Sequence, residues 1–379
     1  MRRLIGVTLG LLVVLAIPGW GQLRNVTINT ESDEGKLLQQ AGDQTDAAAK
    51  VKLLEEFLSK FGAHEAAGYV HLQLLTEYLK VNNFDKALEH GQQAQAKAPA
   101  DLELAHFLVK AAEGKGDAEG LAKVVEGAHA IAQKAAASPK PSDADEEAAW
   151  KNNVAFAGQV QQYNQHALFG TALKQTTPQG KVLLFDLLRK NYPGGQFDKS
   201  LDAQYVDAYR QLGQQDKMVA AAEAALAGEP DNEAFLYIAG ESYLDPAKGK
   251  VPESQVNAEK ILSLLPNKAK PQGIADDAWA QHKATYTGLA NSLLGRSLAT
   301  QGKFAPAQKV LLAATKELKT NNEALGQAYF FLGFCAVKLN QTNAALNYLG
   351  QAAKIPGPYQ APATDLLGKV RAAAGRPGK

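Results

Sequence analysis

The stretch 201–243 constrains the fold most, because one helical hairpin ends in it and the next one begins. An apolar helical pattern runs to Tyr209, is interrupted at Gly213, and a second helical stripe then continues as far as Pro230. Directly after this proline, the spacing of the first helix starts again at Leu236. A hairpin followed at once by another hairpin is typical of a helical repeat array, in which stacked neighbours build one continuous core.

Small and bulky residues recur in the same phase in five segments of the chain. The segments start at Gly68, Lys199, Glu233, Gly288 and Gly326, and the first two are each followed by a further unit at Leu102 and Glu233. The matching residues are Leu74, Tyr78, Ala87, Ala94 and Pro99; Tyr209, Gly213, Ala225 and Pro230; Gly240 and Tyr243; Leu294, Gly295, Gly302, Ala307 and Ala314; and Tyr329, Leu332, Gly333, Ala345 and Ala352.

This pattern resembles the tetratricopeptide repeat, a helical hairpin of about 34 residues. In that family, small residues at two positions allow the helices of a hairpin to approach closely, and a proline ends the second helix. Leu75 and Val206 replace the expected small residue in two units, and the unit at Leu102 is degenerate. The resemblance implies an all-α fold, a right-handed superhelical array of antiparallel helix hairpins, or tetratricopeptide-like α-solenoid.

The first residues read as a secretory signal. Arg2 and Arg3 precede an apolar run, Leu4–Ile17, and the small residues Gly19 and Gly21 suit a cut before Gln22. The run is shorter than the about 20 residues that span a bilayer, so we expect no stable membrane span after processing. The protein is therefore expected to be exported, periplasmic or extracellular, and an uncleaved N-terminal anchor is the alternative.

Composition shifts divide the rest of the chain. Pro139 and Pro141 stand among polar residues that do not continue a helix, which indicates a linker. The expected segments are a signal peptide at 1–21, a flexible lead-in at 22–32, an N-terminal helical array at 33–137, the linker at 138–144, a C-terminal array at 145–355, and a capping helix with a disordered tail at 356–379.

Charge and chemistry exclude several classes of function. Lys and Arg number 40 against 39 Asp and Glu, so nothing favours a nucleic-acid partner. Cys335 is the single cysteine and forms no intramolecular disulfide; we expect it to be a small packing residue. Motifs for serine hydrolases, phosphate loops and zinc proteases are absent, and the seven histidines are scattered. We expect no catalysis, no metal and no cofactor.

The resemblance also implies a binding surface, because the first helix of each hairpin lines the concave face of a tetratricopeptide array. The implied partner-binding residues are Asp207, Arg210, Tyr237, Glu241, Leu289, Ser292, Arg296, Gln327, Phe330, Phe334 and Lys338, with Tyr69, Leu72, Glu103, His106 and Lys110 from the N-terminal array. Burial of Phe330, Phe334 and Leu72 under neighbouring hairpins is the alternative. The clamp for an acidic C-terminus known in chaperone-binding members is missing.

The aromatic rings and the two cations, Arg296 and Lys338, favour an extended peptide with an apolar residue near a carboxylate. The first expectation is thus an exported scaffold of the bacterial kind that binds protein or peptide in the cell envelope. The second is a glycan- or nutrient-binding helical protein beside an outer-membrane transporter. A third is an envelope enzyme acting on polysaccharide, for which the turn at 245–253 would be the place to look.

Overall fold

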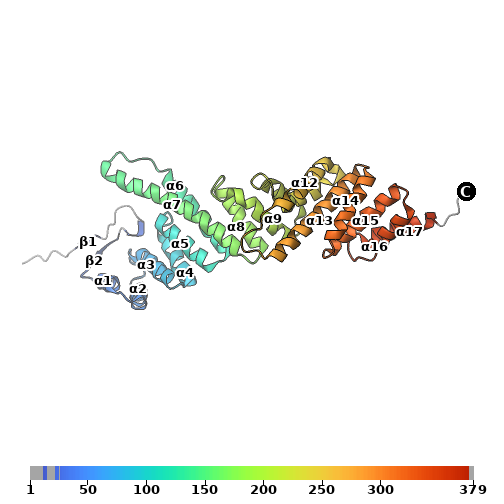
Figure 1. Ribbon diagram of the computed structural model, residues 1–379. Coiled ribbons are helices and arrows are strands. Elements are labelled where there is room, and N and C mark those ends of the chain that lie inside the picture. The colour runs from blue at the N-terminus through green and yellow to red at the C-terminus, as the bar shows by residue number, and fades with distance from the viewer. Residues whose placement is uncertain (1–11, 15–21, 25, 375–379) are drawn as a thin grey trace, which may run out of the picture. The chain divides into compact units, whose positions relative to one another are not determined.

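The structure is a computed structural model that describes residues 12–14, 22–24 and 26–374. Almost all of this part of the chain is helical (Figure 1). A short strand, β1 (Leu12–Val14), pairs antiparallel with β2 (Thr27–Asn29), and a 3-10 turn, η1 (Gln22–Arg24), precedes β2. The rest of the expected signal peptide, at 1–11 and 15–21, and the last residues of the tail, 375–379, lie outside the described residues.

The chain forms two compact units, which we call unit 1 (Met1–Leu201) and unit 2 (Asp202–Lys379). The helices of unit 1 are α1 (Asp33–Asp43), α2 (Ala47–Phe61), α3 (Ala67–Lys80), α4 (Phe84–Lys97), α5 (Leu102–Lys115), α6 (Ala118–Ala136), α7 (Ala144–Lys174) and α8 (Pro178–Asn191). Helix α9 (Asp198–Gln211) contains the division between the units.

The helices of unit 1 begin and end where local chemistry favours it. Asp101 and Asp117 accept hydrogen bonds from the first free N–H groups of α5 and α6, and such N-caps stabilise a helix by about 1 kcal/mol each. Helix α5 ends at Gly116, whose φ of +74° is a conformation that glycine adopts readily. Ser32, Asp46, Asn83 and Thr177 cap other helices of the unit in the same way.

The segment 138–144, expected to be a linker between two arrays, lies inside unit 1. It joins α6 and α7, which pack against each other through Ala132, Ala157 and Val160. The Trp150 Nε1 donates to the backbone oxygen of Ser138 at 3.0 Å, so α7 also holds the end of this connection. The two compact units divide at 201/202, outside this segment.

Unit 2 continues the succession of hairpins. After the end of α9 its elements are α10 (Gln215–Ala225), α11 (Glu233–Tyr243), η2 (Pro246–Lys248), α12 (Val251–Leu264), η3 (Leu265–Asn267), α13 (Asp276–Thr300), α14 (Phe304–Glu317), α15 (Asn322–Lys338), α16 (Thr342–Ala352) and α17 (Gln360–Ala374). The expected enlarged connections are the two 3-10 turns, η2 and η3.

The pattern of helix contacts identifies a solenoid. Each helix from α10 to α17 packs against the next one, and second-neighbour contacts join α11 to α13, α13 to α15 and α15 to α17. In unit 1 they likewise join α3 to α5 and α5 to α7, and α6 also contacts α8. The side of each array formed by the odd-numbered helices, α3 to α7 in unit 1 and α11 to α17 in unit 2, is called its inner face. The expected all-α solenoid of antiparallel hairpins is confirmed.

Two glycines of the repeat pattern lie at the helix crossings where the sequence placed them. A Cβ added to Gly295 would stand 2.4 Å from the Leu311 Cγ, and one added to Gly333 would stand 2.5 Å from the Leu349 Cγ. Cys335 is fully buried in the same core, where burial raises the pKa of its thiol to about 11. The expected packing role of this cysteine agrees with its position.

Candidate functional site

The inner face of unit 2 brings together most of the residues that the repeat phase implied. Tyr237 and Glu241 lie one turn apart on α11, and Ser292 and Arg296 lie one turn apart on α13. Because α11 contacts α13 and α13 contacts α15, these pairs form a continuous row with Gln327 and the aromatic residues of α15. We call the set Tyr237, Glu241, Ser292, Arg296, Gln327, Phe330, Phe331, Phe334 and Tyr359 the Arg296 cluster.

The centre of the cluster is an ion pair. The Arg296 Nη1 donates to both carboxylate oxygens of Glu241, at 2.5 and 2.7 Å, and the Arg296 side chain is 10% exposed. Burial lowers the pKa of Arg296, but the charge of Glu241 and the hydrogen bonds to it outweigh burial, so that the pKa is raised. The guanidinium also lies over the Phe331 ring, 5.4 Å from its centroid, in cation–π geometry.

Arg296, one of the two cations expected to meet a carboxylate of the partner, is therefore already paired within the chain. Glu241 already supplies the opposite charge, and a second carboxylate at this point would meet the negative charge of Glu241. The buried Arg296 Nε has no hydrogen-bond partner among the described atoms. Because the guanidinium is paired and largely buried, the Glu241 side chain, which is 28% exposed, is the member of the pair that a partner can reach.

A chain of polar side chains runs from α13, the helix that carries Arg296, to Tyr359 near the end of the array. The Ser292 Oγ donates to the Gln327 Oε1 at 3.4 Å, and the Gln327 Nε2 donates to the Tyr359 hydroxyl at 3.0 Å. Tyr237 is half-buried, and burial, together with the neighbouring Glu241, raises its pKa well above 10. Its phenol therefore stays protonated.

Aromatic rings make up the other half of the cluster. The Tyr359 ring lies 5.4 Å from Phe330 and 5.9 Å from Phe331, measured between centroids. Phe331 and Phe334 are 6.4 Å apart, and the Lys338 Nζ stands over Phe334 at 5.5 Å. All four rings are half-buried, so they neither disappear into the core nor stand free in solvent.

Other expected residues have different surroundings. Leu72 is fully buried and is unavailable to a partner, and Ser292 is 1% exposed. Asp207 and Arg210 are exposed and form a salt bridge with each other on α9, at 3.0 Å. Leu289 packs against the core of unit 2.

Of the expected residues in unit 1, His106 is surrounded by rings. It lies edge-on to Phe156 and Tyr163, and burial, with a smaller contribution from Lys110, lowers its pKa to about 4. The Lys110 Nζ stands over the Tyr163 ring at 5.8 Å. His106 and Lys110 of α5 thus pack against the aromatic rings of Phe156 and Tyr163, which lie on α7.

Sequence reasoning missed two members of the Arg296 cluster. Phe331 lies next to the implied position 330, and helical spacing alone does not say which of two adjacent rings turns inward. Tyr359 precedes the capping helix, directly before the point where the next repeat of the phase would start. Tyr359 stands one repeat length after Leu325, and a bulky residue at this spacing was the sequence signal that could have identified it.

The structure also brings together two clusters of polar side chains that the sequence did not indicate. The Nδ1 atoms of His71 and His90 are 3.0 Å apart, although these residues come from different helices. Glu233, which is 5% exposed, receives hydrogen bonds from His282 at 2.6 Å and from Lys268. His282 lies in the turns of α13 that precede Gly288, so the hairpin begins earlier than its repeat phase implied.

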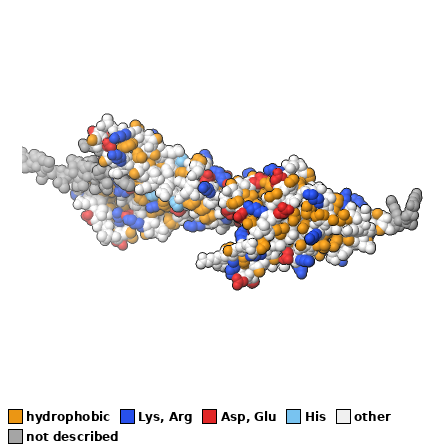
Figure 2. All heavy atoms as spheres, turned by 45° about the horizontal axis from the view of Figure 1, so that its top comes forward, with side chains coloured by type: hydrophobic (Ala, Val, Ile, Leu, Met, Phe, Trp, Pro, Cys, Tyr) orange, Lys and Arg blue, Asp and Glu red, His pale blue; other side chains and the backbone are white. Residues whose placement is uncertain are grey.

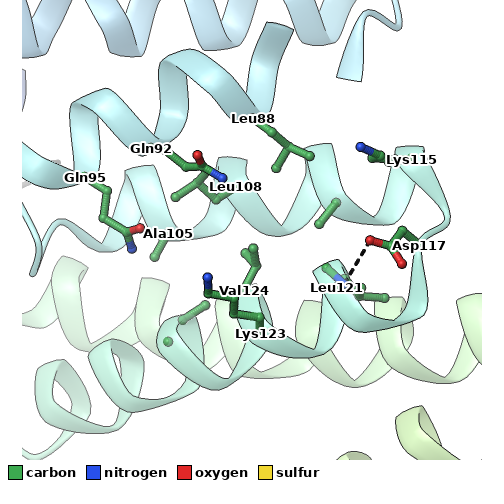
Figure 3. Close-up of a pocket in the computed structure, with 14 residues that line it drawn as sticks. Leu88, Gln92, Gln95, Ala105, Leu108, Lys115, Asp117, Leu121, Lys123 and Val124 are labelled. Carbon is green, nitrogen blue, oxygen red and sulfur yellow. Dashed lines mark hydrogen bonds between the residues drawn. The ribbon is translucent and has the colours of Figure 1, made fainter. Parts of the chain in front are cut away.

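A cavity of about 430 Å³ opens between α4, α5 and α6 (Figure 3). Its floor is formed by small and apolar side chains, and its edge carries Gln92, Gln95, Lys115 and Lys123. Figure 3 shows Leu88 from α4, Leu108 from α5 and Leu121 and Val124 from α6 facing the same space. The small residues of α5 and α6 leave this gap between neighbouring hairpins.

Surface charges of both signs are interspersed on the visible face of each unit (Figure 2). Among the described residues, no three His, Cys, Asp or Glu side chains are grouped so that they could bind a metal ion. In the same part of the chain, every helix is too short or too polar to cross a membrane.

No protein-family model matches the chain, and no curated protein matches it. Similar solved structures include the crystal structure of the P58(IPK) TPR domain, with 10% sequence identity, coverage of 91% of this chain and 100% of that chain, and a TM-score of 0.31. Another is NprR in complex with its cognate peptide NprX, with 12% identity, coverage of 79% and 82%, and a TM-score of 0.30. The helix packing described above, rather than either likeness, establishes the solenoid.

Proposed function

We propose that the chain is an exported, non-catalytic scaffold that binds a protein or peptide partner in the cell envelope through the Arg296 cluster. One observation carries this proposal: four half-buried aromatic rings lie side by side at the inner face, next to a polar row. Interface hot spots combine such rings with Arg in the same way. A solenoid also presents its inner face as an extended surface, which suits an extended segment.

The surroundings of the cluster define the chemistry of the partner. Phe330, Phe334 and Tyr359 favour apolar or aromatic side chains, because these rings remain partly exposed. The Arg296–Glu241 pair favours a backbone or side-chain amide, whose N–H can donate to the partly exposed Glu241 carboxylate. If the partner carries a carboxylate, the exposed Lys338 is the cation that it would meet.

Site-specific crosslinking tests the proposal. The photoreactive residue p-benzoylphenylalanine is placed at Phe330 and, in a control protein, at Leu312, which is 40% exposed on α14. We expect one defined adduct in the native envelope at position 330 and a weaker or different pattern at 312. The same adduct at both positions, or at neither, would contradict the assignment of the site.

Binding then has to follow the named side chains. For a partner obtained in this way, the double change Phe330→Ala with Tyr359→Ala should weaken binding by roughly 2–4 kcal/mol, since aromatic anchors dominate such interfaces. Leu312→Ala is the matched control and should leave binding unchanged.

Export is tested separately. The apolar run with small residues before Gln22 supports cleavage at that point. We expect the intact mass of protein recovered from the periplasm or the medium to correspond to a chain starting at Gln22. A membrane-bound product that retains Met1 would favour the N-terminal anchor instead.

A further inference from the structure

Residues 22–24 and 26–30, which belong to the expected flexible lead-in at 22–32, lie against the inner face of unit 1. Leu23 is 8% exposed and packs into the core that contains Leu72 and Leu75. Its backbone N–H donates to the Asp101 Oδ2 at 3.1 Å. The segment therefore reaches α3 and α5 before the chain turns back to form α1.

Arg24 gives the segment a second, directional contact. Its Nε and Nη2 donate to the two oxygens of Glu103, each at 2.6 Å. The Glu103 side chain is 9% exposed, so this fork of two parallel hydrogen bonds is largely shielded from water. A two-point contact of this geometry is specific to arginine, because lysine offers only a point charge.

The surface that receives the segment is formed to fit it. Gly68 leaves room for Leu23, since an added Cβ would stand 2.7 Å from the Leu23 Cδ2. Asp101 uses its second oxygen to cap α5, accepting from the Leu104 N–H at 2.9 Å. Glu103 is one of the residues that the repeat phase implied for partner binding.

One side of the segment is loosely covered. A cavity of about 320 Å³ lies between it and α1, lined by Arg24, Val26, Ile28, Leu38 and Tyr69 among others. Leu23 and Arg24 hold the first half of the segment, whereas Ile28 packs with Leu37 and Phe57, β2 pairs with β1, and Asn29 accepts hydrogen bonds from Glu31 and Ser32. The first half therefore rests on few contacts beside an open space, which favours its exchange over permanent burial.

We propose that residues 22–30 are a displaceable internal ligand, and that the surface formed by Gly68, Asp101 and Glu103 binds an extended segment in which an apolar residue directly precedes an arginine. The chain's own segment fills this site and blocks it. A partner that carries the same apolar–Arg pair displaces the segment. This site lies in unit 1 and is independent of the Arg296 cluster in unit 2.

A labelled peptide of residues 22–30 is the probe, measured by fluorescence anisotropy against the full chain. Arg24→Glu opens the site, because the introduced carboxylate and Glu103 repel each other. We expect the peptide to bind this variant at least roughly tenfold more tightly than the wild type, in which the tethered segment competes at an effective concentration on the order of millimolar. Circular dichroism establishes that the variant is folded.

A charge exchange makes the test specific. Glu103→Arg should bind a peptide carrying Arg24→Glu and should lose the original peptide. Lys60→Glu, which alters an exposed ion pair on α2, is the matched control and should behave like the wild type. A concentration-dependent dimer that Glu103→Arg abolishes would also support the proposal, since the segment would then be exchanged between copies. Two results would overturn the proposal. One is that Arg24→Glu fails to bind the original peptide and Glu103→Arg fails to bind the charge-exchanged peptide. The other is that Glu103→Arg leaves binding of the original peptide unchanged.

Discussion

Leu349 of α16 lies directly against Gly333 of α15, so closely that the glycine has no space for a Cβ. The nearest atoms of Leu349 include its backbone nitrogen, at 3.2 Å from the position of such a Cβ. Backbone atoms yield less readily than the end of a flexible side chain. The distance between these two helices is therefore set by the hydrogen atom that glycine has in place of a side chain.

The first prediction follows from this contact. Gly333→Ala should lower the free energy of unfolding by about 1–3 kcal/mol through overpacking, although alanine favours a helix by about 1 kcal/mol relative to glycine. The measurement is chemical denaturation followed by circular dichroism.

Gly350 provides the matched control. It lies in the same hairpin, on α16, and an added Cβ would meet nothing within 4 Å. Gly350→Ala should therefore be neutral or stabilising by up to about 1 kcal/mol. Equal effects at the two positions would mean that the contact with Leu349 does not limit the helix distance.

The second prediction concerns the asymmetry of the Arg296–Glu241 pair. The side-chain exposures are 10% for Arg296 and 28% for Glu241. Glu241→Gln leaves the more buried charge without its counter-ion, whereas Arg296→Gln leaves a carboxylate that water can reach. We expect Glu241→Gln to be the more destabilising change, with a loss on the order of 3 kcal/mol. Unfolding experiments on both single variants check the order.

The double variant completes the comparison. With both residues changed to Gln no charge is left unpaired, so the loss should be smaller than the sum of the two single losses. Additive losses would show that the two side chains do not stabilise each other.

Local signals explain why much of the fold was predictable from the sequence. Gly295 and Gly333 recur in phase because each allows a close helix crossing within its own hairpin, and this spacing is visible along the chain. The helix ends at the C-cap residues Gly116 and Tyr192 likewise depend on residues close in sequence.

Contacts between distant residues were not predictable in the same way. Glu241 reaches Arg296 across 55 positions, and Arg24 reaches Glu103 across 79. The repeat phase states which helix face a residue occupies, but not which charge of a neighbouring hairpin stands opposite. The segment 22–30 has no helical period, and its polar composition alone does not reveal that Leu23 and Arg24 are anchored.

The third prediction concerns pH. Burial, then the neighbouring charges of His90 and Lys97, lowers the pKa of His71 from 6.5 to about 4, and burial lowers the pKa of His90. Between about pH 4 and pH 6.5, His71 binds a proton in the unfolded chain but not in the folded chain. Stability should therefore be complete above about pH 6.5 and should fall as the pH decreases toward 4.

Substitution of the histidine tests the source of this dependence. His71→Asn should reduce the slope of unfolding free energy against pH between 7 and 5, where carboxylates with an ordinary pKa of 4.5 contribute little. Part of the slope should persist, because the pKa of His106 is also lowered to about 4. His166→Asn is the control at an exposed position and should leave the slope unchanged; an equal effect of both changes would contradict this assignment.

The last prediction decides whether 138–144 separates two independent domains. A protease site inserted between Pro139 and Ser142 places the cut in an exposed connection. Because Ala132 of α6 packs against Ala157 and Val160 of α7, the two fragments should stay associated after cleavage and co-elute in gel filtration. The uncut protein with the same insertion is the control. Hydrophobic contacts between α6 and α7 do not require chain continuity, so cleavage removes only the tether and costs mainly the entropy of joining two pieces. Fragments that separate and each remain helical would restore the boundary that the prolines suggested, and the contacts between α6 and α7 would then be too weak to define one unit.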